Sequence, residues 1–342
     1  VLIAFGMWAG GRFELPTIDM KWGIENVAED GTVTQLVDPS TLKTFTVEGL
    51  RSVKCYGSSM TFKAKLEKVP GVHGVRTYVN RHSADILYDP AKTSEEKIQE
   101  AIYQPTKFRV ATPDHKAVEN LKVVTIRTEK MYDKMDINYL GMQMRLSGKK
   151  IYGLESEFAC PLIVRVYMDP SEDLSEDWFE EIVEMKTIQM PVHGGGVKEI
   201  EVDYEFVELE EGSSTVSTAD FIKGMFSAFN VQWKSRVEAA SGKKQYIYEI
   251  VDSNYEKPII LRNMPYLSNH LSKHEGVIGV YLTLNDDLQP CIRIRYAEPM
   301  TSEKLWELMT METWTITYKA DDVREEGAKI SFKTPGKVIE YK

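Results

Sequence analysis

Apolar positions recur along this chain in three stretches that share one order of elements. Each stretch starts with a candidate strand, at residues 44–47, 122–127 and 246–251. Apolar residues at spacings of three, four and seven follow, and such spacings place side chains on one face of a helix. These residues are Phe62, Leu66 and Val69, then Ile137, Leu140 and Met144, then Met264, Leu267 and Leu271. Each stretch therefore predicts a strand followed by a helix.

The second half of each stretch predicts two strands around a second helix. A glycine-containing strand comes first, at residues 72–75, 151–154 and 277–280. The next strand ends at a proline that lacks an N–H, namely Pro90, Pro170 and Pro299. A serine suited to the helix N-cap follows, namely Ser94, Ser175 and Ser302. With a last strand at 108–110, 187–190 and 313–316, the chain predicts an α+β protein of tandem βαββαβ, or ferredoxin-like, units with antiparallel sheets.

These repeats divide the chain into five expected segments. The N-terminal segment covers residues 1–43, and the ferredoxin-like units cover 44–115, 116–195 and 246–342. An insertion at 196–245 separates the last two units, with a strand predicted over 197–209, a helix over 218–229 and a hairpin turn at 242–244. A length of 342 residues suits two or three domains.

The first twelve residues are mostly apolar, and two interpretations of them are open. They can form a strand or helix of a protein core, or they can be the end of a transmembrane helix with Trp8 at the interface and Arg12 just outside it. The run is too short to cross a bilayer, which takes about 20 residues. The second interpretation predicts a membrane-anchored protein with its soluble part in the periplasm or the cytoplasm.

The net charge of −10 argues against nucleic acid as a partner, because an acidic chain repels phosphate backbones. The charge is compatible with cations and with basic partner surfaces. As partners we expect another protein or a membrane domain, and a metal ion. The chain carries no phosphate-binding loop, dinucleotide fingerprint or zinc-protease motif. The sequence also offers no paired acid and base, so we predict a protein that is not an enzyme.

The loop into the first predicted helix carries the most distinctive motif. It reads Ser52-Val53-Lys54-Cys55-Tyr56-Gly57-Ser58, and the helix after it ends at Pro70-Gly71-Val72. Residues 44–110 thereby resemble the heavy-metal-associated (HMA) domain family, whose pattern is G-M-x-C-x-x-C, an amphipathic helix and P-G-V. This resemblance implies a βαββαβ fold that binds Cu(I), zinc or cadmium through two thiolates, in a metallochaperone or the metal-binding part of a transporter.

The chain departs from the family at the second cysteine, which falls on Ser58. Cys55 is therefore the candidate metal ligand, with Ser58 and Met60 as candidate helpers, although Met60 also suits the core. Three roles for Cys55 stay open: a metal ligand shared with a partner's thiol, a redox thiol, and a residue without chemistry. A position at a helix N-terminus favours the thiolate that the first two roles require.

The other units lack thiols at the matching positions, which we predict to be Lys134 with Ile137 and Ile260 with Asn263. His270 and His274 have the spacing of a metal pair on a helix but lack a third ligand at a telling distance. We expect Cys160 and Cys291 to be buried and inert.

Three functions follow from these features. The first is a non-enzymatic HMA-like module of a membrane-linked metal-transport or thiol/metal-handling system, with Cu(I) or another soft metal ion at Cys55. The second is a protein-interaction scaffold of ferredoxin-like repeats that has lost metal binding. The third is a thiol redox component that uses Cys55.

Overall fold

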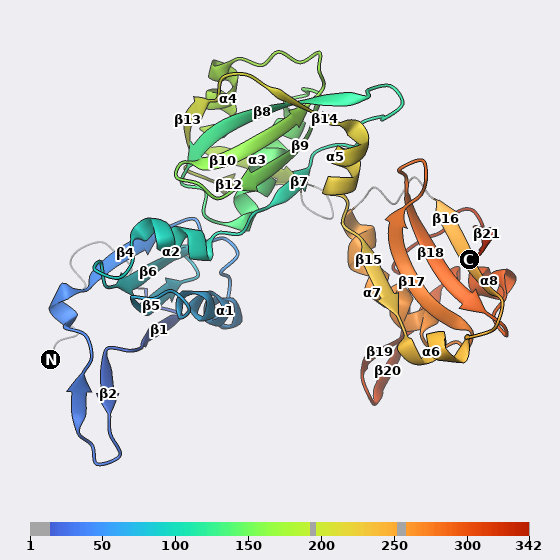
Figure 1. Cartoon of the computed structure of the whole chain (residues 1–342), viewed down its shortest axis with the longest axis horizontal. Helices are drawn as coiled ribbons and strands as arrows, with labels where there is room; N and C mark the ends of the chain where they lie inside the picture. The colour runs from blue at the N-terminus through green and yellow to red at the C-terminus, as the bar shows by residue number, and fades with distance from the viewer. Residues whose placement is uncertain (1–13, 192–195, 252–257, 342) are drawn as a thin grey trace. The chain divides into compact units, whose positions relative to one another are not determined.

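The structure is a computed structural model that describes residues 14–191, 196–251 and 258–341 (Figure 1). The chain forms two compact units, residues 1–218 and 219–342. It is a mixed α+β protein with several small antiparallel sheets and, among the described residues, eight α-helices. None of these helices combines the length and apolar character that a membrane crossing requires. The predicted end of a transmembrane helix lies outside the described residues.

The first sheet has four antiparallel strands in the order β1 (Ile18–Lys21), β5 (Val72–Tyr78), β6 (Ser83–Tyr88) and β4 (Lys43–Val47). Helices α1 (Tyr56–Leu66) and α2 (Glu95–Ile102) pack on one face, where Phe62, Leu66 and Ile98 join the core. A hairpin of β2 (Glu25–Val27) and β3 (Val33–Gln35) and the short helix η2 (Pro39–Thr41) connect β1 to β4. The sheet thus combines an N-terminal strand with the first predicted repeat.

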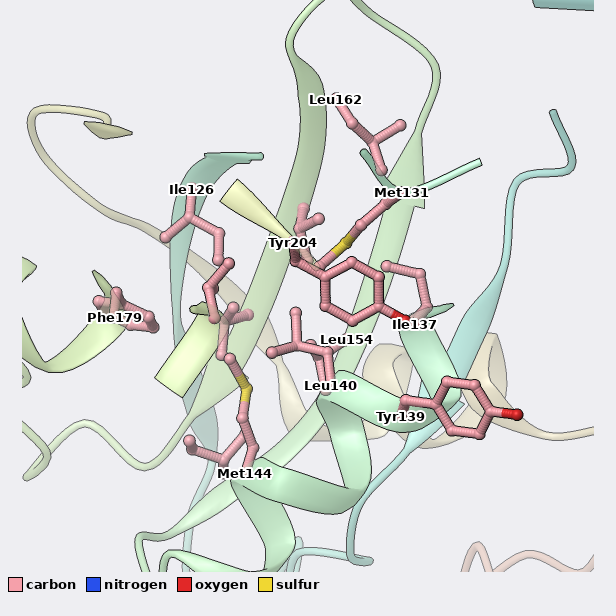
Figure 2. Close-up of a cluster of buried hydrophobic side chains, with 14 of the residues drawn as sticks. Ile126, Met131, Ile137, Tyr139, Leu140, Met144, Leu154, Leu162, Phe179 and Tyr204 are labelled. Atoms are coloured by element: carbon pink, nitrogen blue, oxygen red, sulfur yellow. The ribbon is translucent and has the colours of Figure 1, made fainter. Parts of the chain in front are cut away.

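The second sheet has β8 (Asn120–Glu129), β10 (Leu162–Met168), β9 (Ile151–Glu157) and β7 (Lys107–Arg109) in that order. Strands β13 (Glu205–Leu209) and β14 (Ser214–Ser217) both pair with the outer edge of β8. Helices α3 (Lys134–Leu146) and α4 (Glu176–Val183) cover its core, which Figure 2 shows around Leu140, Leu154 and Phe179. Strands β11 (Thr187–Pro191) and β12 (Val197–Glu201) form a separate hairpin.

The third sheet belongs to the second unit and has the order β15 (Phe229–Gln232), β17 (Val277–Leu284), β18 (Pro290–Ala297), β16 (Gln245–Val251) and β21 (Lys337–Glu340). Helices α7 (Pro258–Leu271) and α8 (Ser302–Met309) supply its core, and β19 (Thr313–Lys319) pairs with β20 (Asp322–Gly327). Helix α5 (Thr218–Met225) precedes β15, and α6 (Lys234–Ala239) follows it.

The three sheets share one register around the glycine of their second strand. Gly74, Gly153 and Gly279 pair with Lys21, Arg109 and Gln232, the last residues of the edge strands β1, β7 and β15. The residue before each glycine lies in a β-bulge, and its carbonyl accepts the N–H of the residue that follows the edge strand. A Cβ at Gly74 would lie 3.1 Å from the carbonyl oxygen of Met20, so close approach of the edge strand explains the glycine.

The last strand of each predicted unit is placed differently from the prediction. Residues 107–109 pair with β9 of the second sheet instead of closing the first sheet. Strands β11 and β19 form hairpins with β12 and β20. The place beside β8 is taken by β13 and β14, and the place beside β16 by β21. Local patterning predicts a strand but not its partner, because pairing depends on distant residues.

Several predicted elements need correction. The strand predicted over 197–209 is two strands, β12 and β13, separated by residues 202–204. The helix predicted over 218–229 ends at Met225, and β15 follows. The turn at 242–244 follows helix α6 instead of joining two strands. Ser94 and Ser175 are confirmed as N-caps, whereas Thr301 rather than Ser302 caps α8.

Candidate functional site

Cys55 lies at the N-cap of α1 and is exposed. Its backbone N–H donates to the hydroxyl of Ser58 over 3.0 Å, and that hydroxyl donates to the carbonyl of Cys55 over 2.9 Å. The Ser58 hydroxyl also accepts the N–H of Lys54 over 2.8 Å. Ser58 therefore closes a capping box, and its hydroxyl is engaged by these bonds within the loop.

The surroundings of Cys55 favour its thiolate form. Hydrogen bonds from the backbone N–H of Ser58, from its hydroxyl and from the N–H of Gly57 lower the pKa of the Cys55 thiol. The sulfur lies 3.6 Å from the Ser58 hydroxyl oxygen. A thiolate is the form that attacks electrophiles and ligates metals. The first turn of α1 thus presents an exposed thiol that ionises more readily than a free cysteine.

The candidate helpers add no metal ligand beside Cys55. Met60 is half-buried and packs against the core of the first sheet, which suits a core residue better than a ligand. Within the described residues, His, Cys, Asp and Glu form no group of three or more that could hold a metal ion. Because Ser58 is engaged in capping, the residues present fit a soft metal only if a second thiol comes from elsewhere.

The other two cysteines have less accessible thiolates. Burial raises the pKa of Cys291 to about 11, and its side chain is buried as predicted. Cys160 is exposed, so its predicted burial is wrong. The reason is that β10 starts only at Leu162, which leaves Cys160 in the preceding loop. Desolvation, together with Glu96 and Glu129, nevertheless raises the pKa of the Cys160 thiol.

His270 is buried in the core of the third sheet, and the half-buried ring of His274 packs edge-on against it. The Nε2 of His270 lies 3.1 Å from the carbonyl oxygen of Leu308, and its Nδ1 accepts the N–H of Thr315 over 3.1 Å. The ring stacks on Trp314 at a centroid distance of 5.8 Å. Both ring nitrogens of His270 are therefore engaged, and burial lowers its pKa. This geometry assigns His270 to packing rather than to metal binding.

Helix α3 begins with the same capping arrangement as α1, but with carboxylates. Asp133 is the N-cap and Asp136 the third helical residue, and the N–H of Asp133 donates to Asp136 over 2.7 Å. The positions that correspond to Cys55 and Ser58 are therefore Asp133 and Asp136. The predicted positions, Lys134 and Ile137, are each one residue too late in the sequence. The reason is that the segment from the helix cap to the glycine of the following strand is one residue longer in the second sheet than in the first.

Asp136 is 3% exposed and forms a buried pair with Tyr204, whose hydroxyl donates to it over 2.7 Å. Figure 2 shows the Tyr204 ring beside Ile137, close to the start of α3. Burial raises the pKa of Asp136 to about 7, although the Asp133 N–H and the Tyr204 hydroxyl act in the opposite direction. Asp136 is thus a buried carboxyl group that titrates near neutral pH.

A cleft of about 670 Å³ within the first unit opens beside this pair. It is lined by the end of β4 and the loop after it, by the turn between β5 and β6, by the segment before α3, and by the end of β12 and the segment after it. The Asp133 carboxylate accepts the N–H of Ser52 over 2.9 Å, and Arg51 donates to the carbonyl of Glu201. These contacts join the loop that carries Cys55 to the second sheet. The wall residues are of both charges, so the cleft indicates no single class of ligand.

Sequence reasoning missed Asp133 and Asp136, although a signal for them exists. An acidic residue followed three positions later by another, directly before an apolar helical stripe, is the pattern of a capping box. Nothing local predicts Tyr204 as the partner of Asp136, because 68 positions separate them. Comparison of the chain with protein-family models, with curated proteins and with solved structures found no match.

Proposed function

We propose that this chain is a non-enzymatic, HMA-like module of a thiol- or metal-handling system, built from three ferredoxin-like units. In this proposal Cys55 supplies one thiolate of a soft-metal site, and a thiol of a partner protein or membrane domain supplies the other. The observation that carries the proposal is the exposed Cys55 thiol with a lowered pKa at the first turn of α1.

The chemistry of soft metals supports a shared site. Thiolates are preferred ligands of Cu(I), whereas hydroxyl oxygen is a poor one. The Ser58 hydroxyl is hydrogen-bonded to the backbone of Cys55, so it is not free to serve as the second ligand of a metal ion. A second thiolate from outside would complete the pair of ligands that the HMA family takes from one chain.

The test is a Cu(I) titration of the reduced full chain against a chromophoric chelator, with and without an added monothiol. The proposal expects competition for Cu(I) that needs the added thiol and that Cys55→Ala removes. Cys160→Ala is the matched control, because it removes the other exposed thiol and should leave the titration unchanged. Uptake that Cys55→Ala retains would refute the shared site.

A scaffold function is the second candidate, and the shared register of the three sheets favours it. The edge strand, bulge and glycine recur in all three sheets, whereas the capping position of α1 carries Cys55 and that of α3 carries Asp133. A scaffold predicts that Cys55→Ala leaves partner binding unchanged. Binding of a captured partner to the reduced wild type and to Cys55→Ala, compared by calorimetry, separates the two functions.

A redox role of Cys55 is the third candidate, and the lowered pKa of the thiol favours it. In this role the Cys55 thiolate would attack a partner's disulfide, forming a mixed disulfide and releasing the partner's other sulfur as a thiolate. Incubation with an oxidised dithiol peptide, followed by non-reducing mass analysis, tests it. Adducts at Cys55 and not at Cys160 would support the role, and equal adducts at both would contradict it.

A further inference from the structure

The outer edge of β4 is uncovered among the described residues, whereas the same edge is covered in the other two sheets. Strand β4 ends the first sheet (Figure 1), and no strand of the described chain pairs with its free side. In the second sheet β13 and β14 cover β8, and in the third sheet β21 covers β16. All of these covering strands run antiparallel to the strand they cover.

The register around the bulge fixes which residues of β4, β8 and β16 correspond. Tyr88, Met168 and Tyr296 each face the residue just before the bulge, and their partners are Lys43, Lys122 and Tyr246. Two positions further on, Phe45, Val124 and Tyr248 face the core residues Ile86, Val166 and Ile294. Thr46 then corresponds to Thr125 and to Glu249.

This correspondence shows which backbone groups of β4 point outward. In the second sheet the carbonyl of Thr125 accepts the N–H of Glu210 from the covering chain over 2.9 Å. In the third sheet the carbonyl of Gln245, four residues before Glu249, accepts the N–H of Tyr341 over 3.0 Å. Groups at alternate residues of a strand point to the same side. Thr44 and Thr46, both exposed, therefore direct their N–H and C=O groups to the free edge.

The side chains at this edge indicate the chemistry of a covering strand. On β16 the residue Val338 faces Tyr248, the counterpart of Phe45, and Glu340 faces Tyr246, the counterpart of Lys43. Phe45 is only half-buried, and Lys43 is exposed and pairs with no described acidic group. A strand like β21 placed on β4 would cover Phe45 with an apolar residue and set a carboxylate opposite Lys43.

The covering strands of the other sheets already bring acidic residues to basic ones. Glu210, just after β13, pairs with Arg127 of β8 at 2.6 Å, and Glu340 of β21 pairs with Lys244, just before β16, at 3.4 Å. Opposite charges on neighbouring strands stabilise their pairing. These two pairs do not fall at the position of Lys43, so the exposed Lys43 itself favours a carboxylate in a segment that covers β4.

We propose that the outer edge of β4 is a docking site for an extended segment of a partner protein. The segment adds antiparallel to Thr44 and Thr46, places an apolar side chain over Phe45 and sets a carboxylate opposite Lys43. Addition of a strand to an open sheet edge is a recurrent mode of peptide recognition, in which main-chain hydrogen bonds give affinity and side chains give specificity. This proposal is independent of Cys55 and goes beyond the metal-handling function.

The probe is a fluorescent peptide with the sequence of residues 336–341, and its binding to the full chain is read by anisotropy. Thr44→Pro removes an outward N–H, and we expect it to weaken binding by about tenfold or more. Lys43→Glu should also weaken binding, and a peptide with lysine in place of its glutamate should restore it. Lys21→Glu, on the opposite edge strand β1, is the matched control and should change nothing.

Hydrogen exchange locates the bound peptide. It also distinguishes an edge that is open to a partner from one that the chain itself or a second copy of the chain covers. The peptide should slow exchange of the Thr44 and Thr46 amides. Slow exchange in the chain alone, unchanged by dilution, would mean that the chain covers the edge itself and would overturn the proposal. Slow exchange lost on dilution would assign the edge to a second copy and would also overturn it. The proposal would also be overturned if the peptide did not bind, or if the lysine-containing peptide failed to restore binding to Lys43→Glu.

Discussion

The carboxylate of Asp133 accepts a hydrogen bond of 2.9 Å from the backbone N–H of Ser52, and this contact joins the first two sheets. The same carboxylate caps α3 by accepting the N–H of Met135 over 2.8 Å. Because Ser52 lies three residues before Cys55, the start of one helix holds the loop of the other. The position of the Cys55 thiol therefore depends on the second sheet as well as the first.

Removal of the Asp133 carboxylate should destabilise the first unit. We expect Asp133→Ala to lower the free energy of unfolding by about 1–2 kcal/mol, because it removes a helix cap. Urea unfolding followed by circular dichroism measures the change. Ser52→Ala is the matched control: it removes only the hydroxyl contact to Asp133 and keeps the backbone N–H bond. Equal effects of the two substitutions would contradict the capping role.

The pH dependence of stability should show the titration of Asp136. Its folded pKa of about 7 lies above that of an unfolded aspartate, about 3.9, so the folded state holds the proton over this window. Its contribution to stability is fully present below pH 4 and is lost as the pH rises to 7. The slope is at most about 1.4 kcal/mol per pH unit.

Two variants isolate the contribution of Asp136 to the free energy of unfolding, measured in urea between pH 4 and pH 8. Asp136→Asn cannot ionise, so its stability should fall less than that of the wild type across this range. Tyr204→Phe removes the hydroxyl that lowers the pKa of Asp136, so the fall should extend to higher pH. Parallel curves for the wild type and Asp136→Asn would contradict the raised pKa.

Thiol labelling should distinguish the three cysteines. We expect iodoacetamide to modify Cys55 faster than Cys160 at pH 7, and Cys291 last, because the pKa of Cys55 is lowered and the other two are raised. Mass spectrometry of tryptic peptides gives the three rates. Ser58→Ala removes one of the hydrogen bonds to the sulfur and should slow labelling at Cys55 only. Faster labelling of Cys160 would contradict this account.

A side chain at the glycine that follows the β-bulge should destabilise the sheet at its edge strand. In Gly279→Ala the new Cβ would clash with the hydroxyl end of the Tyr281 side chain and would lie 3.0 Å from the carbonyl oxygen of Val231 in the edge strand β15, so we expect a loss of about 1–3 kcal/mol in unfolding free energy. Gly224→Ala in α5 is the control, because a Cβ there meets nothing within 4 Å and alanine favours helix. Equal stability of the two variants would show that neither the Tyr281 side chain nor the edge strand constrains Gly279.

The sequence predicts the local elements of this fold well. The strand predicted over 44–47 is observed as Lys43–Val47, and the one over 246–251 as Gln245–Val251. The stripe of Met264, Leu267 and Leu271 is fully buried, as its spacing predicts. Hydrophobic periodicity and capping residues act within a few positions, so single-sequence patterns capture them.

The partners of the strands and the site are harder to predict. Nothing in residues 107–109 indicates that they join the second sheet, because that choice depends on β9 more than 40 positions later. Cys55 and Ser58 are predicted by their motif, but the capping role of Ser58 depends on hydrogen-bond geometry. The pairing of Asp136 with Tyr204 arises only when the segment after β12 folds back over α3.

Native mass spectrometry of the reduced full chain with one equivalent of Cu(I) tests the proposed shared site at Cys55 most directly. The account predicts a complex of one chain, one copper ion and one added monothiol, and it predicts that Cys55→Ala loses this species while Cys160→Ala keeps it. Copper retained equally by the Cys55→Ala chain would contradict the account.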